Sequence, residues 1–425
     1  MTKTMTALSA AALLSAMLMS GTAHAQTVVS LMHVETGAPL IEAWEKIATD
    51  FEASHPDVDV QIQFLENEAF KAKLPTLLQS DAAPDIFYSW GGGVLKEQSG
   101  TGALYDLTAD MDAEGGAWRN SYNSGPLGGL VYDGKVWAVP YKTGSIAFFY
   151  NKEQFAKAGV NADSIKSWDD LLGAVSTLKN AGLTPLACGG GDKWPLHFYW
   201  SYLVMRNAGQ DAFNAAKANE GDGFNGAPFV KAGEQLRQLG ELEPCQAGYL
   251  GATWPDSLKS FADGKAAMIL GFEATWQNQK TNATDGNGLA QENLGRFAFP
   301  EVPGGVGKAT DTLGRLNGWA LKANPKPEAI EFIKFFTNRD NERALASAGF
   351  IIPVTVDSGD AVTDPLMKQS AEQVAGSTWH QNFFDQDLGP AVGRVVNDVS
   401  VEMFVGNLSG ADGAAMIKSE LDLAL

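Results

Sequence analysis

The stretch VVSLMHVETGAPLIEAWEKIATDFEASHPDVDVQIQF, residues 28–64, decides the fold of this chain. It opens with a short apolar run at 28–32 that predicts a strand. Apolar residues then recur three and four apart, as at Ile41, Trp44 and Ile47, and predict a helix. After Pro56, apolar residues alternate through 58–64 as in a half-buried strand. A strand, a helix and a strand at this spacing are typical of the βαβ unit of a parallel sheet.

The same alternation continues with a predicted helix at 70–78 and a third strand at 84–88. Ligands of such sheets bind beyond the carboxyl ends of the strands. Here those ends are His33-Val34-Glu35, Leu65-Glu66-Asn67 and Ser89-Trp90-Gly91. Because each carries polar or aromatic groups directly after an apolar run, the sequence predicts a binding site at this edge.

A second unit begins near Gly144, with a predicted strand at 146–150 and a helix that starts at Trp168 after Ser167 as N-cap. A chain of 425 residues exceeds what one hydrophobic core usually supports, so two lobes are expected. The glycine runs 91–93 and 189–191 are predicted to be loops, since neither matches a phosphate-binding motif in a strand-to-helix context.

The N-terminus has the features of a secretory signal peptide. Lys3 precedes an apolar run from Ala7 to Met19, and Ala23-His24-Ala25 supplies small residues for cleavage after Ala25. The apolar run is too short to span a bilayer, and the following Gln26 gives no site for lipid attachment. We therefore expect an exported, soluble protein of a bacterial periplasm.

The two cysteines, Cys188 and Cys245, are expected to form a disulfide in that oxidising compartment, although two free thiols remain an alternative. The formal charge of −19 is poorly suited to nucleic acid or to an anionic membrane, since both require Lys and Arg. The five histidines are scattered, and no catalytic motif is present. We expect no metal, no cofactor and no enzymatic activity. A carboxylate pair of a secreted glycosidase stays open as the distant alternative.

The aromatic residues are more informative than the charged ones. The chain has 11 tryptophans, and several lie beside polar groups in loop-like settings, as in 193–197, 272–276 and 379–385. Sugars present apolar C–H faces and a rim of hydroxyls, so their sites combine flat aromatic rings with amide and charged groups. This distribution favours a carbohydrate-binding site.

Several segments, in order along the chain, resemble the extracellular solute-binding proteins of sugar ABC importers, the family that includes the maltose-binding protein. They are Trp44–Glu52 with His55–Val58, Ala83–Ile86, Tyr132–Tyr141 with Phe149–Lys152, Phe261–Met268, and Asp385-Gln386 before Leu388–Gly393. Asp387 replaces the tyrosine usual after the Asp-Gln pair, and Glu273 stands where small residues or tryptophan are common. The departure at Glu273 suggests a ligand unlike that of better-known relatives.

The resemblance implies an α/β, two-lobed periplasmic-binding-protein type II fold, with the ligand cleft between lobes joined by crossing hinge segments. It implies residues 26–142 and 275–338 as lobe 1, and 143–274 and 339–425 as lobe 2. The protein would be a monomeric substrate-binding component that captures a mono- or oligosaccharide by lobe closure and delivers it to an ABC permease in the inner membrane. A polyamine or an acidic sugar is the alternative ligand, the latter through Lys142 and Arg315.

The resemblance also implies ligand contacts on strand ends, crossings and loops of both lobes. The residues are Glu35, Glu66, Trp90, Lys142, Trp194, His197, Trp254, Glu273, Trp276, Asn317, Trp379 and Asp385. Each has a plainer interpretation as well, such as a helix-start acid for Glu66 and an ion pair with a surface carboxylate for Lys142.

Overall fold

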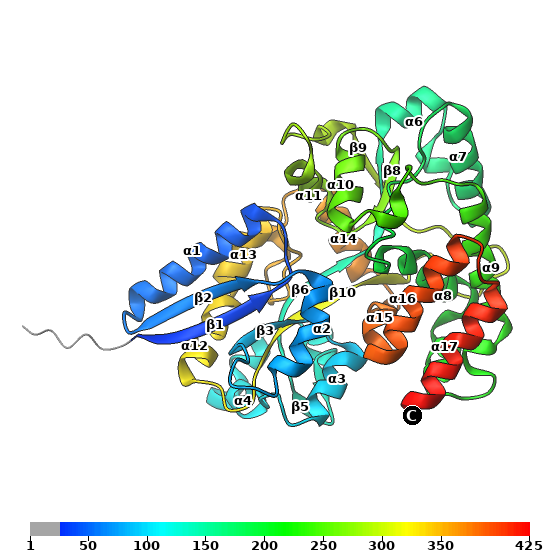
Figure 1. Cartoon of the computed structure of the whole chain (residues 1–425). Coiled ribbons are helices and arrows are strands. Elements are labelled where there is room, and N and C mark those ends of the chain that lie inside the picture. Colours follow the sequence, from blue (N-terminus) through cyan, green and yellow to red (C-terminus); the bar gives the residue numbers. More distant parts are fainter. Residues whose placement is uncertain (1–25) are drawn as a thin grey trace, which may run out of the picture.

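The computed structural model describes residues 26–425, and the predicted leader with its cleavage site lies outside the described residues. Figure 1 shows two lobes side by side, joined by β6 and β10. The predicted two-lobed α/β architecture is confirmed. Among the described residues, no helix combines the length and the apolar character needed to cross a bilayer.

The first lobe is built on one mixed sheet with the strand order β11-β10-β3-β1-β2, and β6 pairs with β10. Its strands are β1 (Thr27–His33), β2 (Val58–Phe64), β3 (Ile86–Ser89), β6 (Val139–Ser145), β10 (Thr312–Leu321) and β11 (His380–Gln381). The parallel pairing of β1 with both β2 and β3 confirms the predicted βαβ units. β10 runs antiparallel to β3 and β6.

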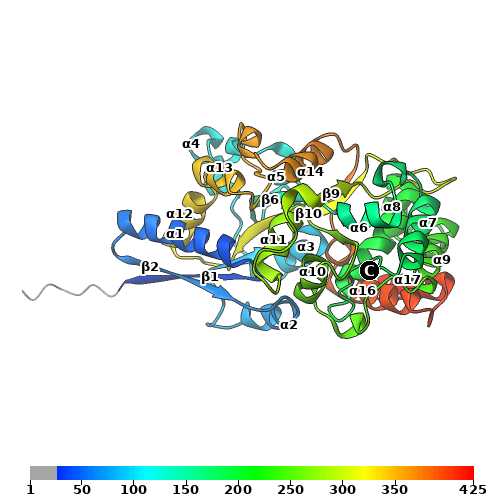
Figure 2. The same cartoon turned by 90° about the horizontal axis from the view of Figure 1, so that it is seen from above.

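Helices cover both faces of this sheet, as the view from above shows (Figure 2). They are α1 (Ala38–Ser54), α2 (Asn67–Leu77), α3 (Gly92–Gly100), α4 (Thr108–Gly116), α5 (Ser124–Gly128), α12 (Pro327–Phe336) and α13 (Arg339–Ser347). A short hairpin of β4 (Val131–Tyr132) and β5 (Lys135–Val136) precedes β6. Trp44 of α1 packs edge-on against Trp319 of β10, so the predicted core face of this helix is confirmed.

The second lobe surrounds a small antiparallel sheet in which β7 (Ala147–Asn151) lies between β8 (Met268–Gly271) and β9 (Leu294–Phe297). Its helices are α6 (Lys152–Ala158), α7 (Trp168–Asn180), α8 (Trp194–Lys217), α9 (Ala227–Glu241), α10 (Trp254–Ala262), α11 (Thr275–Asn282), α15 (Phe384–Asp387), α16 (Pro390–Phe404) and α17 (Gly410–Ala424). Helix α14 (Pro365–Ala375) contributes Leu366 and Met367 to the cores of both lobes. Single 3-10 turns lie at Arg119–Ser121, Ala162–Ser164, Gly223–Asn225, Tyr249–Gly251, Gln291–Asn293 and Gly359–Ala361.

The hydrophobic cores divide the chain differently from the predicted boundaries at two points. Residues 275–302 pack with the second lobe, because β9 pairs with β7 and Phe299 stacks on Tyr202. Residues 339–362 pack with the first lobe, where Leu345 and Val354 lie in the core. The chain therefore returns to the first lobe through β10 and, apart from the short β11, leaves it again after α14.

Two local features, a pair of glycines and a disulfide, fix segments of the chain close together. Gly92 and Gly93 begin α3, whereas the sequence predicts a loop there. A Cβ on either residue would lie within 3 Å of backbone atoms of the segment 386–389, so these glycines allow α3 to touch α15. In the second lobe, Cys188 and Cys245 form a disulfide with their Cα atoms 5.7 Å apart, which links the segments before α8 and after α9.

Candidate functional site

Two cavities lie where the lobes meet. The first encloses about 470 Å³ and is lined from the first lobe by the segments after β1 and β3, the start of α2, and β10. The second lobe contributes the starts of α8 and α10, with Phe272 and Phe383. The carboxyl ends of parallel strands therefore do form one wall, at the edge that the strand order predicts.

One glycine run positions the tryptophans of the opposite wall. Gly189, Gly190 and Gly191 pass so close to the segment 249–253 that a Cβ on any of them would lie about 3 Å from its backbone oxygens. The Asp192 carboxylate accepts a hydrogen bond from the backbone N–H of Trp254 at 2.6 Å, which connects the two helix starts. As a result, Trp194 and Trp254 lie with ring centroids 5.4 Å apart.

Two acidic and two basic side chains form a charge cluster at and below the floor of the first cavity. Lys142 Nζ, which is buried, lies 2.5 Å from Glu35 Oε1. Arg315 Nε lies 3.4 Å from Glu273 Oε1, and Arg315 Nη1 lies 4.0 Å from Glu35. The four formal charges sum to zero, so this floor presents no net charge to a ligand.

The pKa directions agree with this pairing. Burial alone would raise the pKa of Glu35, but the charges of Lys142 and Arg315 outweigh it and lower the pKa to about 2. Burial lowers the pKa of Lys142, and the neighbouring Glu35 opposes that shift. The Arg315 guanidinium also lies 4.1 Å from the centroid of the Phe272 ring, which covers it from the second lobe.

Polar atoms without partners point to a ligand in the first cavity. Asn317 is 1% exposed and lines the cavity, yet neither its Oδ1 nor its Nδ2 has a hydrogen-bond partner in the protein. The indole Nε1 of Trp194 is buried without a partner as well. Buried polar atoms are nearly always hydrogen-bonded, so these groups are suited to hydroxyls supplied from outside.

A smaller space of about 70 Å³, the neck, shares lining residues with both cavities, and Trp90 lines all three spaces. At the neck, Lys71 Nζ of the first lobe lies 3.5 Å from Asp385 Oδ2 of the second. Burial would raise the pKa of Asp385, but His197 and Lys71 outweigh it and lower that pKa. Burial lowers the pKa of His197, whose Nε2 lies 3.7 Å from Asp385 Oδ1.

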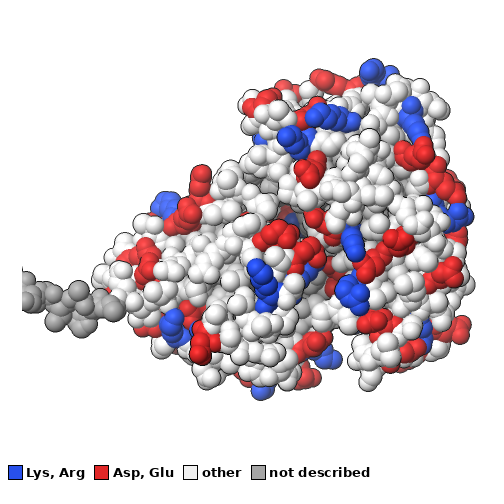
Figure 3. All heavy atoms as spheres, viewed as in Figure 1, with Lys and Arg blue, Asp and Glu red and all other residues white. Residues whose placement is uncertain are grey.

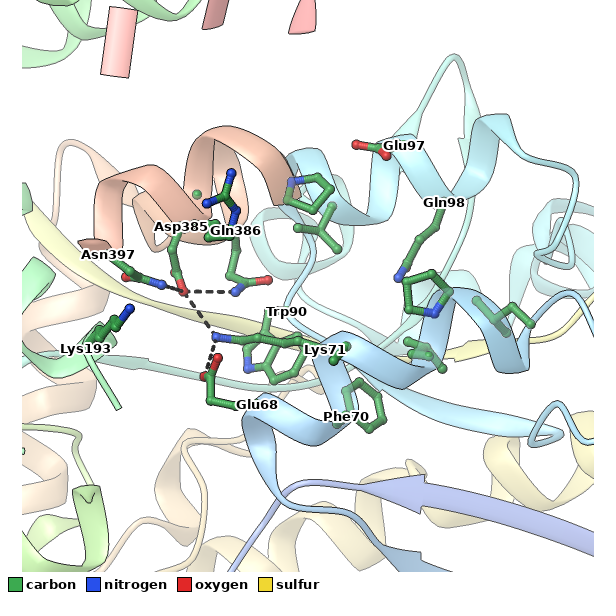
Figure 4. A pocket seen from close by; sticks show the side chains of 18 of the residues that line it. Glu68, Phe70, Lys71, Trp90, Glu97, Gln98, Lys193, Asp385, Gln386 and Asn397 are labelled. Atoms are coloured by element: carbon green, nitrogen blue, oxygen red, sulfur yellow. Dashed lines mark hydrogen bonds and ion pairs between the residues drawn. The ribbon is translucent and has the colours of Figure 1, made fainter. Parts of the chain in front are cut away.

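The second cavity encloses about 710 Å³ between α2 and α3 on one side and α15 and α16 on the other. Figure 4 shows the chain of contacts at its inner end, where Lys71 reaches across Trp90 toward Asp385 and Asn397. On the surface, acidic and basic side chains surround the hollow where the lobes meet (Figure 3).

The structure brings eight of the twelve predicted contact residues to these spaces. They are Glu35, Glu66, Trp90, Trp194, His197, Trp254, Asn317 and Asp385. Glu66 also caps α2, because its carboxylate accepts hydrogen bonds from the backbone N–H groups of Glu68 and Ala69. Its plainer interpretation and its position at the cavity are therefore compatible.

Four predicted residues do not reach the cavities. Lys142 and Glu273 are buried behind the floor in ion pairs with Glu35 and Arg315. Trp276 packs beside Gly349 and under Lys280, whereas Asn278 of the same helix lines the first cavity. Trp379 lies in the core of the second lobe against Phe213, and its Nε1 donates to the Gln381 side chain.

Sequence reasoning missed several lining residues. Phe272 lies next to the predicted Glu273, and Asp192 lies two residues before Trp194. Arg315, which was considered only for an acidic ligand, lies two residues before Asn317 on β10. Since residues i and i+2 of a strand share a face, the predicted Asn317 was a signal that Arg315 faces the cleft too. No comparable pattern in the sequence indicates that Lys71 lies at the cleft.

Among residues 26–425, no group of three or more His, Cys, Asp or Glu side chains is placed to hold a metal ion. Two α/β lobes that enclose a cleft with aromatic and hydrogen-bonding walls define a protein that holds a small solute between its lobes. The chain belongs to the family of bacterial extracellular solute-binding proteins, whose model matches residues 37–343.

Three similar proteins are consistent with this family assignment. The chain is 24% identical over 302 residues to the multiple sugar-binding protein of Streptococcus mutans, covering 69% of this chain and 67% of that one. It is 28% identical over 319 residues to the diacetylchitobiose binding protein DasA of Streptomyces coelicolor, covering 72% and 68%. It is 22% identical over 440 residues to the sn-glycerol-3-phosphate-binding periplasmic protein UgpB of Rhizobium meliloti, covering 95% and 93%.

Solved structures show the same fold. A chitin oligosaccharide binding protein superposes with a TM-score of 0.82 at 22% identity, covering 94% of this chain and 99% of that one. The binding protein RafE in complex with raffinose superposes with a TM-score of 0.71 at 18% identity, covering 92% and 99%.

Proposed function

We propose that this protein is the periplasmic substrate-binding component of a sugar ABC transporter, which captures a neutral mono- or oligosaccharide between its lobes and delivers it to a membrane permease. The observation that carries the proposal is the first cavity, which Trp90, Trp194 and Trp254 line together with the unpartnered Asn317. Tryptophan faces suit the C–H faces of a sugar, and the amide suits its hydroxyls. Relatives named for sugars and for diacetylchitobiose support the same class.

The balanced charge cluster favours a neutral ligand. A polyamine requires carboxylates that are free to pair with it, but those that line the first cavity are already engaged. Glu35 pairs with Lys142 and Glu68 with Lys71, while Glu66 and Asp192 accept backbone N–H groups. Behind the floor, Glu273 pairs with Arg315. An acidic sugar requires a free cation, and the same pairing occupies Lys142 and Arg315. A charged ligand would therefore have to break ion pairs that are largely buried, which costs several kcal/mol.

The sn-glycerol-3-phosphate-binding relative makes a small phosphorylated polyol the second candidate. It would draw on Arg315, which lines the first cavity, rather than on Lys142, which does not. Breaking the contact of Arg315 with Glu273 would oppose its binding.

Lobe closure follows from the arrangement of the walls. Neither lobe alone surrounds the first cavity, so a bound solute is desolvated only when both walls contact it. A ligand with higher affinity for the closed form shifts the population toward that form. Closure then presents both lobes together to a permease.

The proposal is tested by thermal-shift measurements on the mature protein against neutral sugars, sugar acids, polyamines and sn-glycerol-3-phosphate, followed by calorimetry on each hit. A ligand that binds only the folded state raises the melting temperature. A shift confined to neutral sugars supports the proposal. A shift confined to polyamines, sugar acids or the phosphate overturns the solute class, and release of smaller sugars from an oligosaccharide would indicate the glycosidase alternative.

A further inference from the structure

The cleft is larger than the first cavity, and its two parts differ in chemistry. The first cavity, at about 470 Å³, already falls within the range of roughly 300–1,000 Å³ that small-molecule sites occupy. The second cavity adds about 710 Å³ on the other side of Trp90. A single sugar ring in the first cavity would leave this larger space unused.

We infer that the ligand is an oligosaccharide that crosses Trp90, with one end read in the first cavity and the remainder held in the second. This inference rests on the proposed function and specifies its substrate class. The neck is the joint between the two parts: Trp90 lines both cavities, and Lys71 Nζ lies 5.8 Å from the centroid of its ring. A chain that crosses the neck meets the Trp90 ring and the polar pair of Lys71 and Asp385.

The second cavity is amphipathic in the way that a sugar chain requires. One wall exposes apolar side chains of α2, of its C-cap residue Leu78 and of α3, among them Pro75 and Val94. Gln79 and Gln98 edge that wall, and Arg394 and Asn397 of α16 face it from the second lobe. Apolar C–H faces can pack on the first wall while hydroxyls reach the amides and the guanidinium.

The two cavities differ in how strictly they can select a ligand. In the first, Asn317 and the Trp194 Nε1 are buried and lack protein partners, so a sugar without matching hydroxyls would leave them unsatisfied. In the second, Gln79 and Arg394 are exposed, so water satisfies them when no hydroxyl does. The first cavity therefore selects which sugar stands at one end of the ligand. The second cavity accepts further sugar units with little regard to their number or linkage.

The test measures affinity by calorimetry for xylo-, cello-, chito- and malto-oligosaccharides of one to five units. In the series that binds, affinity should rise at least tenfold from the monomer to the trimer. Gln98→Trp, which fills the second cavity from α3, should remove this gain and leave the affinity for the monomer unchanged. Lys96→Trp is the matched control, because Lys96 lies exposed on the same helix outside the cavity.

A second blocking variant, Arg394→Trp, approaches from the opposite wall and serves if Gln98→Trp does not fold. A monomer that binds as tightly as the trimer overturns the inference and leaves the proposed function intact. If Gln98→Trp and Lys96→Trp bind the trimer with equal affinity, the inference is likewise overturned and the proposed function stands. Failure of every series at every length overturns the proposed sugar function itself.

Discussion

At the scale of single residues, Arg315 is the side chain on which the floor of the cleft depends. It contacts Glu35 of the first lobe and Glu273, which follows β8 of the second lobe. Both carboxylate oxygens of Glu273 are buried without a hydrogen-bond partner, so Arg315 is its main compensation. Arg315→Met should therefore lower the free energy of unfolding by about 3–5 kcal/mol, because it leaves a buried charge uncompensated.

Urea denaturation checks this expectation, and the double variant Arg315→Met/Glu273→Gln is its control. Removing both charges should recover most of the loss, since a neutral amide then replaces the buried carboxylate. An Arg315→Met variant as stable as the wild type would show that the pair does not matter to the fold.

Glu342 gives the stability of the first lobe a pH dependence. Burial raises its pKa to about 8, although the backbone N–H groups of Val354 and Thr355 donate to its carboxylate and oppose the shift. The unfolded chain loses this proton near the ordinary value of 4.5. Between these two pKa values the folded state binds more protons, so its stability falls as pH rises, by up to about 1.4 kcal/mol per pH unit.

The variant Glu342→Gln tests this pH dependence, because its side chain cannot titrate. Its melting temperature should fall less than that of the wild type between pH 5 and pH 8, a range set by those pKa values. Parallel melting curves for the two proteins would contradict this assignment.

At the scale of elements, close helix packing in the second lobe depends on a glycine. A Cβ at Gly240 of α9 would lie 1.7 Å from the carbonyl oxygen of Phe404 in α16. Gly240→Ala must push the helices apart and should cost about 1–3 kcal/mol or more. Gly173 of α7 is the matched control: a Cβ there meets nothing within 4 Å, so Gly173→Ala should stabilise by about 0.5–1 kcal/mol. Thermal unfolding of both variants measures the contrast, and equal effects would show that α9 and α16 are less tightly packed.

The elements also show what the sequence could and could not predict. The elements from 27 to 64 follow from periodicity, because β1 and α1 each bury one face, whereas β3 is buried on both faces. Trp276 and Trp379 pack on or in the core, which the sequence does not reveal, since a tryptophan beside polar residues looks the same whether its side chain faces the cleft or the core. The pairing of Lys71 with Asp385 joins residues 314 positions apart, and no local pattern contains it.

At the scale of the whole molecule, the ion pair between Lys71 and Asp385 is a contact that connects the two lobes across the cleft. Burial would lower the pKa of Lys71, but Asp385 and Glu68 outweigh it and raise that pKa, so the lysine stays charged at neutral pH. Lys71→Met removes the attraction and should shift the sugar-free protein toward the open arrangement, by about 1 kcal/mol or roughly a fivefold change in population. Small-angle scattering should then give a larger radius of gyration than for the wild type. Lys73→Met, an exposed position on the same helix, should leave the radius unchanged. If both variants scatter like the wild type, the pair does not hold the lobes together, and closure depends on the sugar alone.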